Sequence, residues 1–431
     1  MAHKTLIGGT AYEISGGKTL VNGTAYSIAE GKTLVGGTAY EVGFGSWPED
    51  LDTALEFTSA NPFTISVATP GWDGTMEYCK GNGWKVWDGS EISSGKSESG
   101  QCIYVRGTGN TKVAGSSCTW ALSGNNIECN GNIEKLLDYA TVIGGKHPAM
   151  KTSCYNSMFR DCTSLTTAPS LPATTLAESC YNSMFLDCTS LTTAPSSLPA
   201  LSLPDSCYSH MFSGCTSLTT APSLSAVVLS YKCRGNMFYG CKGLKTAPNL
   251  PATTLGNYCY SDMFRDCTSL TTAPSLPATK LKDACYLNMF YGCKGLKTAP
   301  SLPATTLTNY CYRSMFYLCT GLTTAPSLPA TTLADWCYAQ MFRYCTSLIT
   351  LPSLPATTLT ERCYYSMFES CTGIKLSATA TGEYQTPYRV PTSGNGTEGS
   401  MSKNSMFSGT GGTVSTAFGI NTTYYTSNTV V

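Results

Sequence analysis

Apolar residues recur with a long period through the middle and C-terminal parts of the chain. Nine segments of the type CYNSMFRDC, between Cys154 and Cys371, place two cysteines eight residues apart around a Met-Phe pair. At about 100° per helical residue, both cysteines, the Tyr, the Met and the Phe fall on one helix face. Asp, Glu or Asn stands shortly before the first Cys in most units, which favours a helix N-terminus there. This pattern predicts one short helix per unit.

Each predicted helix is followed by a segment of the type LTTAPSLPATTL. The LTTAP part favours a short strand that proline ends, and the remainder favours an extended return. The units recur every 26 residues, with a single spacing of 27. We therefore predict an α/β leucine-rich-repeat solenoid of nine units over residues 146–375. Because strands lie about 4.8 Å apart and helices about 8–10 Å apart, we expect a curved stack with helices on its convex face.

Other patterns flank the solenoid. Residues 1–45 contain three copies of a 14-residue unit of the type KTLVGGTAYEV, in which Gly-Gly or Asn-Gly joins two short β-prone runs. Such dipeptides favour hairpin turns, and strands of about four residues are not stable alone. We expect β-hairpin repeats that serve attachment or oligomerisation, with a flexible leader as the alternative.

Residues 46–145 alternate apolar and polar positions between Gly, Asn and Ser, and predict an antiparallel β-sandwich-like domain. Trp72, Trp84, Trp87 and Trp120 are expected in its core rather than in a sugar site. Residues 376–431 are predicted to form an insertion and a C-terminal cap. They contain SMFSGTGG at 405–412, a Met-Phe unit without cysteines.

Charge and motifs exclude several classes of function. The 27 basic and 27 acidic residues balance, so the chain has no net electrostatic attraction for nucleic acid or anionic membrane. No apolar stretch is long enough for a signal peptide or a membrane span, and we expect no membrane insertion. No phosphate-binding glycine loop, H-E-x-x-H motif or calcium loop is present, so we expect no cofactor, no metal site and no enzyme activity.

The cysteines leave disulfides, metal binding and packing as alternatives. Zinc sites use closely spaced Cys or His clusters, whereas the spacing here is Cys-x7-Cys, and the three histidines do not follow it. Eight helical residues span about 12 Å, too far for a disulfide, whose Cα atoms lie within about 7 Å. Bridges between neighbouring units would need unusually close helices. We therefore expect two ladders of free thiols packed in the core. One bridge among Cys79, Cys102, Cys118 and Cys129 of the β domain stays open.

Variation among the nine units indicates where a ligand would bind. The apolar positions barely change, whereas positions just before the first Cys and between the apolar pairs do. Tyr, Trp and Arg, which are enriched at binding hot spots, gather there in units four to nine. We predict a ligand-binding stripe on the convex face. The TTAP strands are the other candidate surface. The alternative to any binding site is that exposed positions vary without functional constraint. The stripe consists of Tyr239, Tyr258, Arg265, Tyr291, Tyr310, Tyr317, Trp336 and Arg343.

The repeat MF..C.SL...P.LPATTL resembles the BspA-type leucine-rich repeats of surface proteins from gut and oral bacteria. The KTLVGGTAYEI units resemble N-terminal segments of structural proteins from bacteriophages of gut bacteria. Together these resemblances imply a non-enzymatic adhesion or receptor-binding protein, carried on a phage virion as a fibre or a tail or head appendage. No export signal or anchor is visible, which favours the virion over a bacterial cell surface.

The resemblances also imply the partners. We expect other virion structural proteins at the N-terminal repeats, a host-surface or mucosal glycan or protein at the solenoid, and a homo-oligomer, with a trimer as the first guess. The alternatives are a purely structural capsid-decoration protein and a bacterial cell-surface adhesin.

Overall fold

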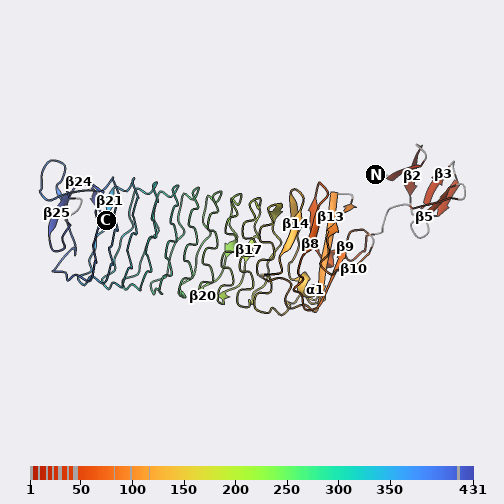
Figure 1. Ribbon diagram of the computed structural model, residues 1–431, viewed down its shortest axis with the longest axis horizontal. Helices are drawn as coiled ribbons and strands as arrows, with labels where there is room; N and C mark the ends of the chain where they lie inside the picture. The colour runs from red at the N-terminus through yellow and green to blue at the C-terminus, as the bar shows by residue number, and fades with distance from the viewer. Residues whose placement is uncertain are drawn as a thin grey trace.

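The computed structural model describes residues 3–7, 10–15, 18–21, 24–27, 32–35, 38–41, 47–81, 83–97, 100–115, 117–414 and 418–431. Only the backbone is described in the first six of these ranges. From residue 47 onward, a β domain continues into a long stack of coils that ends in short C-terminal strands (Figure 1).

The N-terminal repeats form antiparallel strand pairs, one for each 14-residue unit. The strands are β1 (His3–Ile7), β2 (Thr10–Ser15), β3 (Lys18–Val21), β4 (Thr24–Ser27), β5 (Lys32–Val35) and β6 (Thr38–Glu41). β1 to β4 form one sheet in chain order, and β5 pairs with β6. The predicted Gly-Gly and Asn-Gly turns lie outside the described residues.

Two sheets form the β domain. Its elements are η1 (Leu51–Thr53), β7 (Leu55–Ser59), β8 (Thr64–Val67), β9 (Thr75–Cys79), β10 (Lys85–Val86), β11 (Ile92–Ser93), β12 (Gly95–Ser97), β13 (Gly100–Thr108), β14 (Trp120–Ser123), β15 (Ile127–Asn130) and α1 (Lys135–Ile143). The larger sheet runs β10-β9-β13-β7-β15, with β12 also paired to β13, and the smaller runs β11-β8-β14. Alternate residues of β7 and β8 are buried in one shared core. Trp87 and Trp120 belong to that core, with ring centroids 5.1 Å apart.

The β domain is fused to the first coil of the solenoid. β15 pairs in parallel with β16 (Leu165–Thr167), which extends the larger sheet into that coil. The backbone N–H of Trp120 donates to the Met158 carbonyl at 2.8 Å, and the ring centroids of Phe57 and Phe159 lie 6.2 Å apart. Because the two parts share one hydrophobic core, the β domain covers the apolar side chains that the first coil would otherwise expose.

The Cys-x7-Cys segments are runs of consecutive turns, so the predicted helices are wrong. Within the described residues, α1 is the only α-helix. Backbone N–H groups alternate between two kinds of acceptor along each segment. Met158 donates to the Tyr155 carbonyl of its own turn at 3.2 Å, whereas Phe159 donates to the Met184 carbonyl of the next coil at 2.9 Å. In a helix, the N–H groups beyond the first turn would bond within their own segment, and the packing distance between helices would hold the coils too far apart for these bonds.

A four-residue period underlies these turns. In the first unit, positive φ angles recur at Ser153, Ser157 and Asp161. The buried positions follow the same period: Cys154, Tyr155, Met158, Phe159 and Cys162. Over nine residues this pattern also fits a 3.6-residue helix, which is why the sequence did not separate the two.

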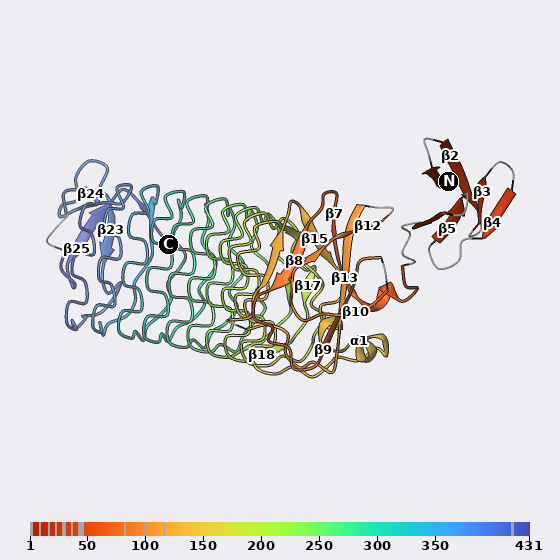
Figure 2. The ribbon, with the colours of Figure 1, turned by 45° about the vertical axis from the view of Figure 1, so that its right-hand side comes forward.

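The coils hydrogen-bond to one another on several sides, so the predicted curvature is wrong as well. Threonines of the LTTAP segments form parallel bridges from coil to coil, such as Thr272↔Thr298. Further short strands lie at β17 (Ser197–Leu198), β18 (Ser202–Leu203), β19 (Ser223–Leu224), β20 (Val228–Leu229) and β21 (Thr350–Leu351). Inside, a stack of phenylalanines from Phe159 to Phe407 spaces its rings 5.2 to 5.7 Å apart. Because neighbouring coils are hydrogen-bonded both at the turn segments and at the LTTAP segments, the stack runs without marked curvature (Figures 1 and 2).

The C-terminal segment adds one more coil to the stack. The Phe368 N–H donates to the Met406 carbonyl at 2.8 Å, so the cysteine-free Met-Phe unit lies on the ninth unit. The remaining strands are β22 (Lys375–Ser377), β23 (Thr386–Arg389), β24 (Gly411–Gly412), β25 (Thr423–Thr426) and β26 (Thr429–Val430). β23, β25, β22 and β24 form one sheet, and β26 pairs with β21.

Candidate functional site

The outward side chains of the turn segments form the surface on which the predicted stripe lies. We call this surface the turn face; it comprises the residues one and two before the first Cys of each unit, and two, three, six and seven after it. Tyr258 is 38% exposed, and the other seven predicted residues are half-buried. The expected single line is wrong, because residues seven apart occupy different positions of a four-residue turn. They lie in two rows.

The first row joins five of the predicted residues across five consecutive coils: Tyr239, Arg265, Tyr291, Tyr317 and Arg343. The Arg265 guanidinium lies between two rings, 5.7 Å from the Tyr239 centroid and 4.3 Å from that of Tyr291. Tyr291 and Tyr317 stack face to face at 4.5 Å, with 5° between their planes. Arg343 lies 5.8 Å from the Tyr317 centroid. The row is thus a continuous series of stacked flat groups.

Carboxylates fix both arginines of the first row. Arg265 donates to Asp262 at 3.2 Å, and Arg343 donates to Glu369 of the following coil at 2.6 Å. Burial alone would lower the pKa of Arg265, but the hydrogen bond that it donates to Asp262 and the charge of that carboxylate raise the pKa overall. Both side chains therefore stay charged and ordered, with their flat faces against tyrosine rings.

The second row contains Tyr310 and Trp336, stacked at 6.1 Å. Three residues that the sequence did not single out complete it. The guanidinium groups of Arg313 and Arg362 lie 4.8 and 4.7 Å from the Trp336 ring centroid, and Tyr365 lies 6.0 Å from it. The four-residue period would have identified Arg313 and Tyr365, because they point outward two positions after their cysteines.

Tyr258 is not part of either row. Its ring centroid lies 6.0 Å from that of Tyr231, with 70° between the ring planes. The next coil places Ala284, a fully buried residue, at the equivalent position, so that no ring connects Tyr258 to Tyr310. The predicted stripe is interrupted there.

Several aromatic residues of the turn face have an unfavourable backbone conformation. Tyr258, Tyr310, Trp336 and Tyr344 have φ angles of 57°, 60°, 59° and 64°. Bulky residues are rare in this region, where strain of about 1–3 kcal/mol is typical. Many other units place Ser, Asp, Asn or Gly at such positions, for example Asn236 and Gly292. The turn conformation therefore does not explain why these positions carry aromatic side chains.

The LTTAP strands provide the second candidate surface, the strand face. One row of this face consists of seven threonines, one from each of seven consecutive coils, whose side chains are exposed or half-buried. Adjacent members pair through parallel bridges on most steps. The residues are Thr167, Thr193, Thr220, Thr246, Thr272, Thr298 and Thr324. This surface is regular but chemically uniform.

All 22 cysteines are buried and free, so the possible bridge in the β domain is not formed. In the ladder formed by the second Cys of each unit, each thiol donates to a backbone carbonyl of the preceding coil, as Cys293 does to Phe264 at 3.0 Å, except that Cys162 donates to Trp120 of the β domain. Burial raises the pKa of the Cys162 and Cys371 thiols to about 12. The helix-packing objection to bridges between units does not hold, because the coils are close. Burial and these donor roles keep the thiols out of reach of reagents.

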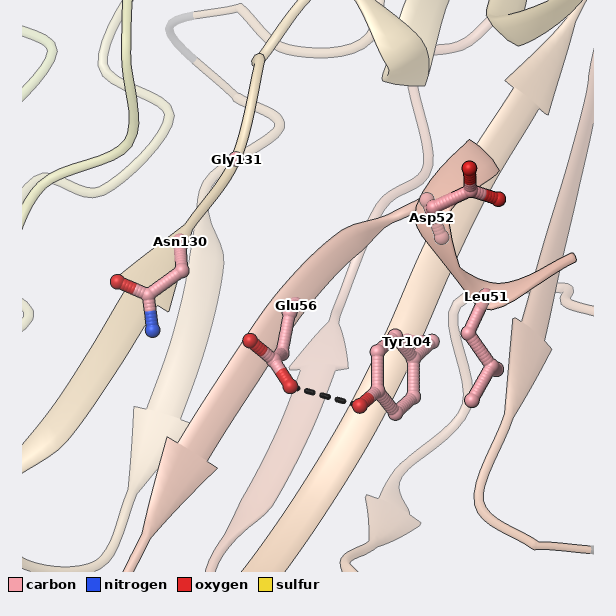
Figure 3. A pocket seen from close by; sticks show the side chains of 7 residues that line it. Leu51, Asp52, Glu56, Tyr104, Asn130 and Gly131 are labelled. Atoms are coloured by element: carbon pink, nitrogen blue, oxygen red, sulfur yellow. Dashed lines mark hydrogen bonds between the residues drawn. The ribbon is translucent and has the colours of Figure 1, made fainter. Parts of the chain in front are cut away.

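A shallow cavity of about 290 Å³ lies in the β domain beside β7 and β13 (Figure 3). The Tyr104 hydroxyl donates to the Glu56 carboxylate at 2.6 Å across it, and burial raises the pKa of Tyr104. The Asp52 side chain points away from this pair (Figure 3). The one inward carboxylate is thus engaged by the tyrosine.

Within the described residues, no group of three or more His, Cys, Asp or Glu side chains is placed to hold a metal ion. In the same part of the chain, no helix has the length and apolar character needed to cross a membrane.

The chain matches no protein-family model and no curated protein sequence. A solved structure described as a leucine-rich repeat protein from Bacteroides ovatus is similar to it, with 18% identity and a TM-score of 0.20. That similarity covers 58% of this chain and 83% of the other. A likeness at that TM-score supports no statement about this chain.

Proposed function

We propose that this chain is a non-enzymatic adhesion or receptor-binding protein that uses its turn face to hold a host-surface or mucosal glycan or protein. One observation carries the proposal: large aromatic residues occupy positive-φ positions of the turns, where small residues suffice. Residues with a strained backbone conformation are concentrated at functional sites, because selection for folding stability alone would replace them.

The chemistry of the two rows suits recognition. Tyr, Trp and Arg supply large contact areas with few rotatable bonds to immobilise. Stacking between coils and the pairing of Arg265 and Arg343 with carboxylates hold the side chains in place before a ligand arrives. Less conformational entropy is then lost on binding. Flat, partly exposed rings over successive coils fit an extended ligand.

The proposed setting is a bacteriophage virion, with the chain as a fibre or as a tail or head appendage. Its support is the resemblance of the N-terminal units to phage structural proteins and of the solenoid to BspA-type leucine-rich repeats. The N-terminal strand pairs would attach to other virion proteins and join copies, with a trimer as our first expectation. A capsid-decoration protein without a receptor and a bacterial cell-surface adhesin are the alternative assignments.

Binding is tested with one combined variant, in which Tyr310, Tyr317, Trp336 and Arg343 are all replaced by Ser. The matched control replaces Thr246, Thr272, Thr298 and Thr324 of the strand face by Ser. We expect the purified chain to bind host cells or a glycan array, the turn-face variant to lose at least tenfold in affinity and the control to keep it. If the control loses binding and the turn-face variant keeps it, the strand face is the site and the turn-face proposal fails.

The virion setting has a separate test. Mass spectrometry of purified phage particles should detect the chain as a particle component, and labelled antibody should place it on their surface. Detection only on bacterial cells would replace the virion assignment with the cell-surface one. A particle protein that binds no host ligand would be a decoration protein.

A further inference from the structure

Arg234 interrupts a stack of tyrosines inside the solenoid. The residue after the first Cys is Tyr in eight of the nine units. Neighbouring rings of this stack lie 5.3 to 6.0 Å apart on either side of the fourth unit. In that unit Arg234 stands between Tyr208 and Tyr260, and its exposed fraction is 0%. A positive charge thus lies within the core.

The hydrogen bonds of this guanidinium are incomplete. Nη1 donates to the Tyr260 hydroxyl at 3.3 Å. Nε and Nη2 are buried and have no hydrogen-bond partner among the described residues. The guanidinium carbon lies 5.9 Å from the Tyr260 ring centroid, at the outer limit of a cation–π contact. Two of the three guanidinium nitrogens are therefore left without an acceptor by the described part of the chain.

The charge of Arg234 is also uncompensated by the described residues, none of whose carboxylates forms an ion pair with it. The titratable groups that it influences are the thiols of Cys207, Cys233 and Cys259 and the phenols of its two tyrosine neighbours. Burial raises the pKa of Cys233 to about 12 even though Arg234 lowers it, so that this thiol is neutral at physiological pH.

A guanidinium does not deprotonate in a protein. Burying a lone ion costs several kcal/mol even after relaxation. An anion close to Nε and Nη2 would offset this cost.

We propose that the core at Arg234 binds a single monatomic anion, chloride in ordinary salt solution, held by Nε and Nη2. The Arg234 N–H keeps its hydrogen bond to the Cys259 carbonyl at 3.1 Å, so the coils stay in contact and the ligand must fit among side chains. The limited space favours a monatomic ion over a larger oxyanion. The surrounding N–H, S–H and O–H groups are all donors, and a halide accepts from several directions at once. This site is independent of the turn face.

Bromide is the probe, because it replaces chloride and scatters anomalously. Crystals of the full chain grown in bromide should show an anomalous peak next to Nε and Nη2. The Arg234→Tyr variant, which restores the repeat, should show none there. In solution, replacing gluconate by bromide at constant ionic strength should raise the unfolding temperature of the parent chain. The rise should be roughly 1–2 °C per tenfold increase in bromide, and absent in the variant.

Two results would overturn the proposal. One is the absence of a bromide peak, with the same salt response in parent and variant. The other is ultraviolet absorbance of a thiolate at neutral pH that Arg234→Tyr abolishes, since the counter-charge would then be a cysteine. Arg234→Met, which removes the charge at similar volume, repeats each measurement should the tyrosine variant fail to fold.

Discussion

Trp336 stacks on Tyr310 of the preceding coil, with ring centroids 6.1 Å apart, although both residues have φ angles close to 60°. A residue with a Cβ atom is destabilised there by about 1–2 kcal/mol. Offset stacking between the rings returns about 0.5–1.5 kcal/mol. Because both residues carry this strain, about 2–4 kcal/mol for the pair, stacking offsets only part of it, and the stability of the solenoid does not explain why these residues are aromatic.

The first prediction separates stability from binding at this pair. Replacing Tyr310 by Asn, which tolerates positive φ, should change the free energy of unfolding by less than about 1 kcal/mol, because relief of strain offsets the lost stacking. Ligand affinity should fall at least tenfold. Tyr312→Ala, two residues away but fully buried, is the control and should cost about 3–5 kcal/mol. Calorimetry and cell binding measure the two effects; a large loss of stability in Tyr310→Asn would contradict the strain argument.

The second prediction concerns the two cysteine ladders, which have equal burial but different bonding. The Cys293 thiol donates to the Phe264 carbonyl, whereas within the described structure the Cys285 thiol makes no hydrogen bond as donor; both side chains are fully buried. Cys293→Ala removes this hydrogen bond, which costs about 1 kcal/mol beyond the lost packing, because the Phe264 carbonyl still accepts the backbone N–H of Cys267 at 3.1 Å. Cys285→Ala should lose packing only. Denaturant unfolding of the two variants should differ by roughly 1 kcal/mol or more, and equal values would show that the thiol bond contributes nothing.

The third prediction is a steep loss of stability in alkali. Cysteine thiols in the unfolded chain ionise near a pKa of about 8.5, whereas burial raises that of Cys180 and Cys311 in the fold to about 12. Between these values the unfolded chain has lost protons that the folded chain keeps, so unfolding becomes easier as pH rises. This stabilisation is fully present below about pH 8 and is lost as pH approaches 12.

Each buried thiol contributes roughly 1 kcal/mol per pH unit in that window, and the nine units hold eighteen of them. The unfolding temperature should therefore drop sharply just above pH 9. A variant with Cys259, Cys285, Cys311 and Cys337 replaced by Ala should show a shallower drop relative to its own value at pH 7. A flat profile between pH 8 and 10 would mean that the thiols titrate equally in both states.

The repeat, its apolar residues and the free thiols could be predicted from the sequence, because burial recurs at fixed positions such as Met289 and Phe290. The turn conformation could not. Over nine residues a four-residue period places the same side chains inward as a helix does, and only hydrogen bonds between coils distinguish them. The predicted curvature and the predicted single stripe both depend on the helices, and both are therefore wrong. The chemistry of Tyr, Trp and Arg indicates a binding surface independently of the backbone conformation, so most residues of the predicted stripe lie in the two rows even though the predicted helix is wrong.

The last prediction tests the turn geometry at two equivalent glycines. Gly240 and Gly292 have φ angles of 70° and 72°. A methyl group at Gly240 would have no atom nearer than 3.9 Å, whereas at Gly292 it would overlap with the Asp266 carboxylate of the preceding coil. Gly240→Ala should therefore cost only the strain of positive φ, about 1 kcal/mol. Gly292→Ala should cost measurably more in denaturant unfolding. Adding Asp266→Ala should return Gly292→Ala to the level of Gly240→Ala, because it removes the clash and leaves the strain. If the two single variants are equally stable, the carboxylate moves aside freely and the coils are less tightly packed at this position than we infer.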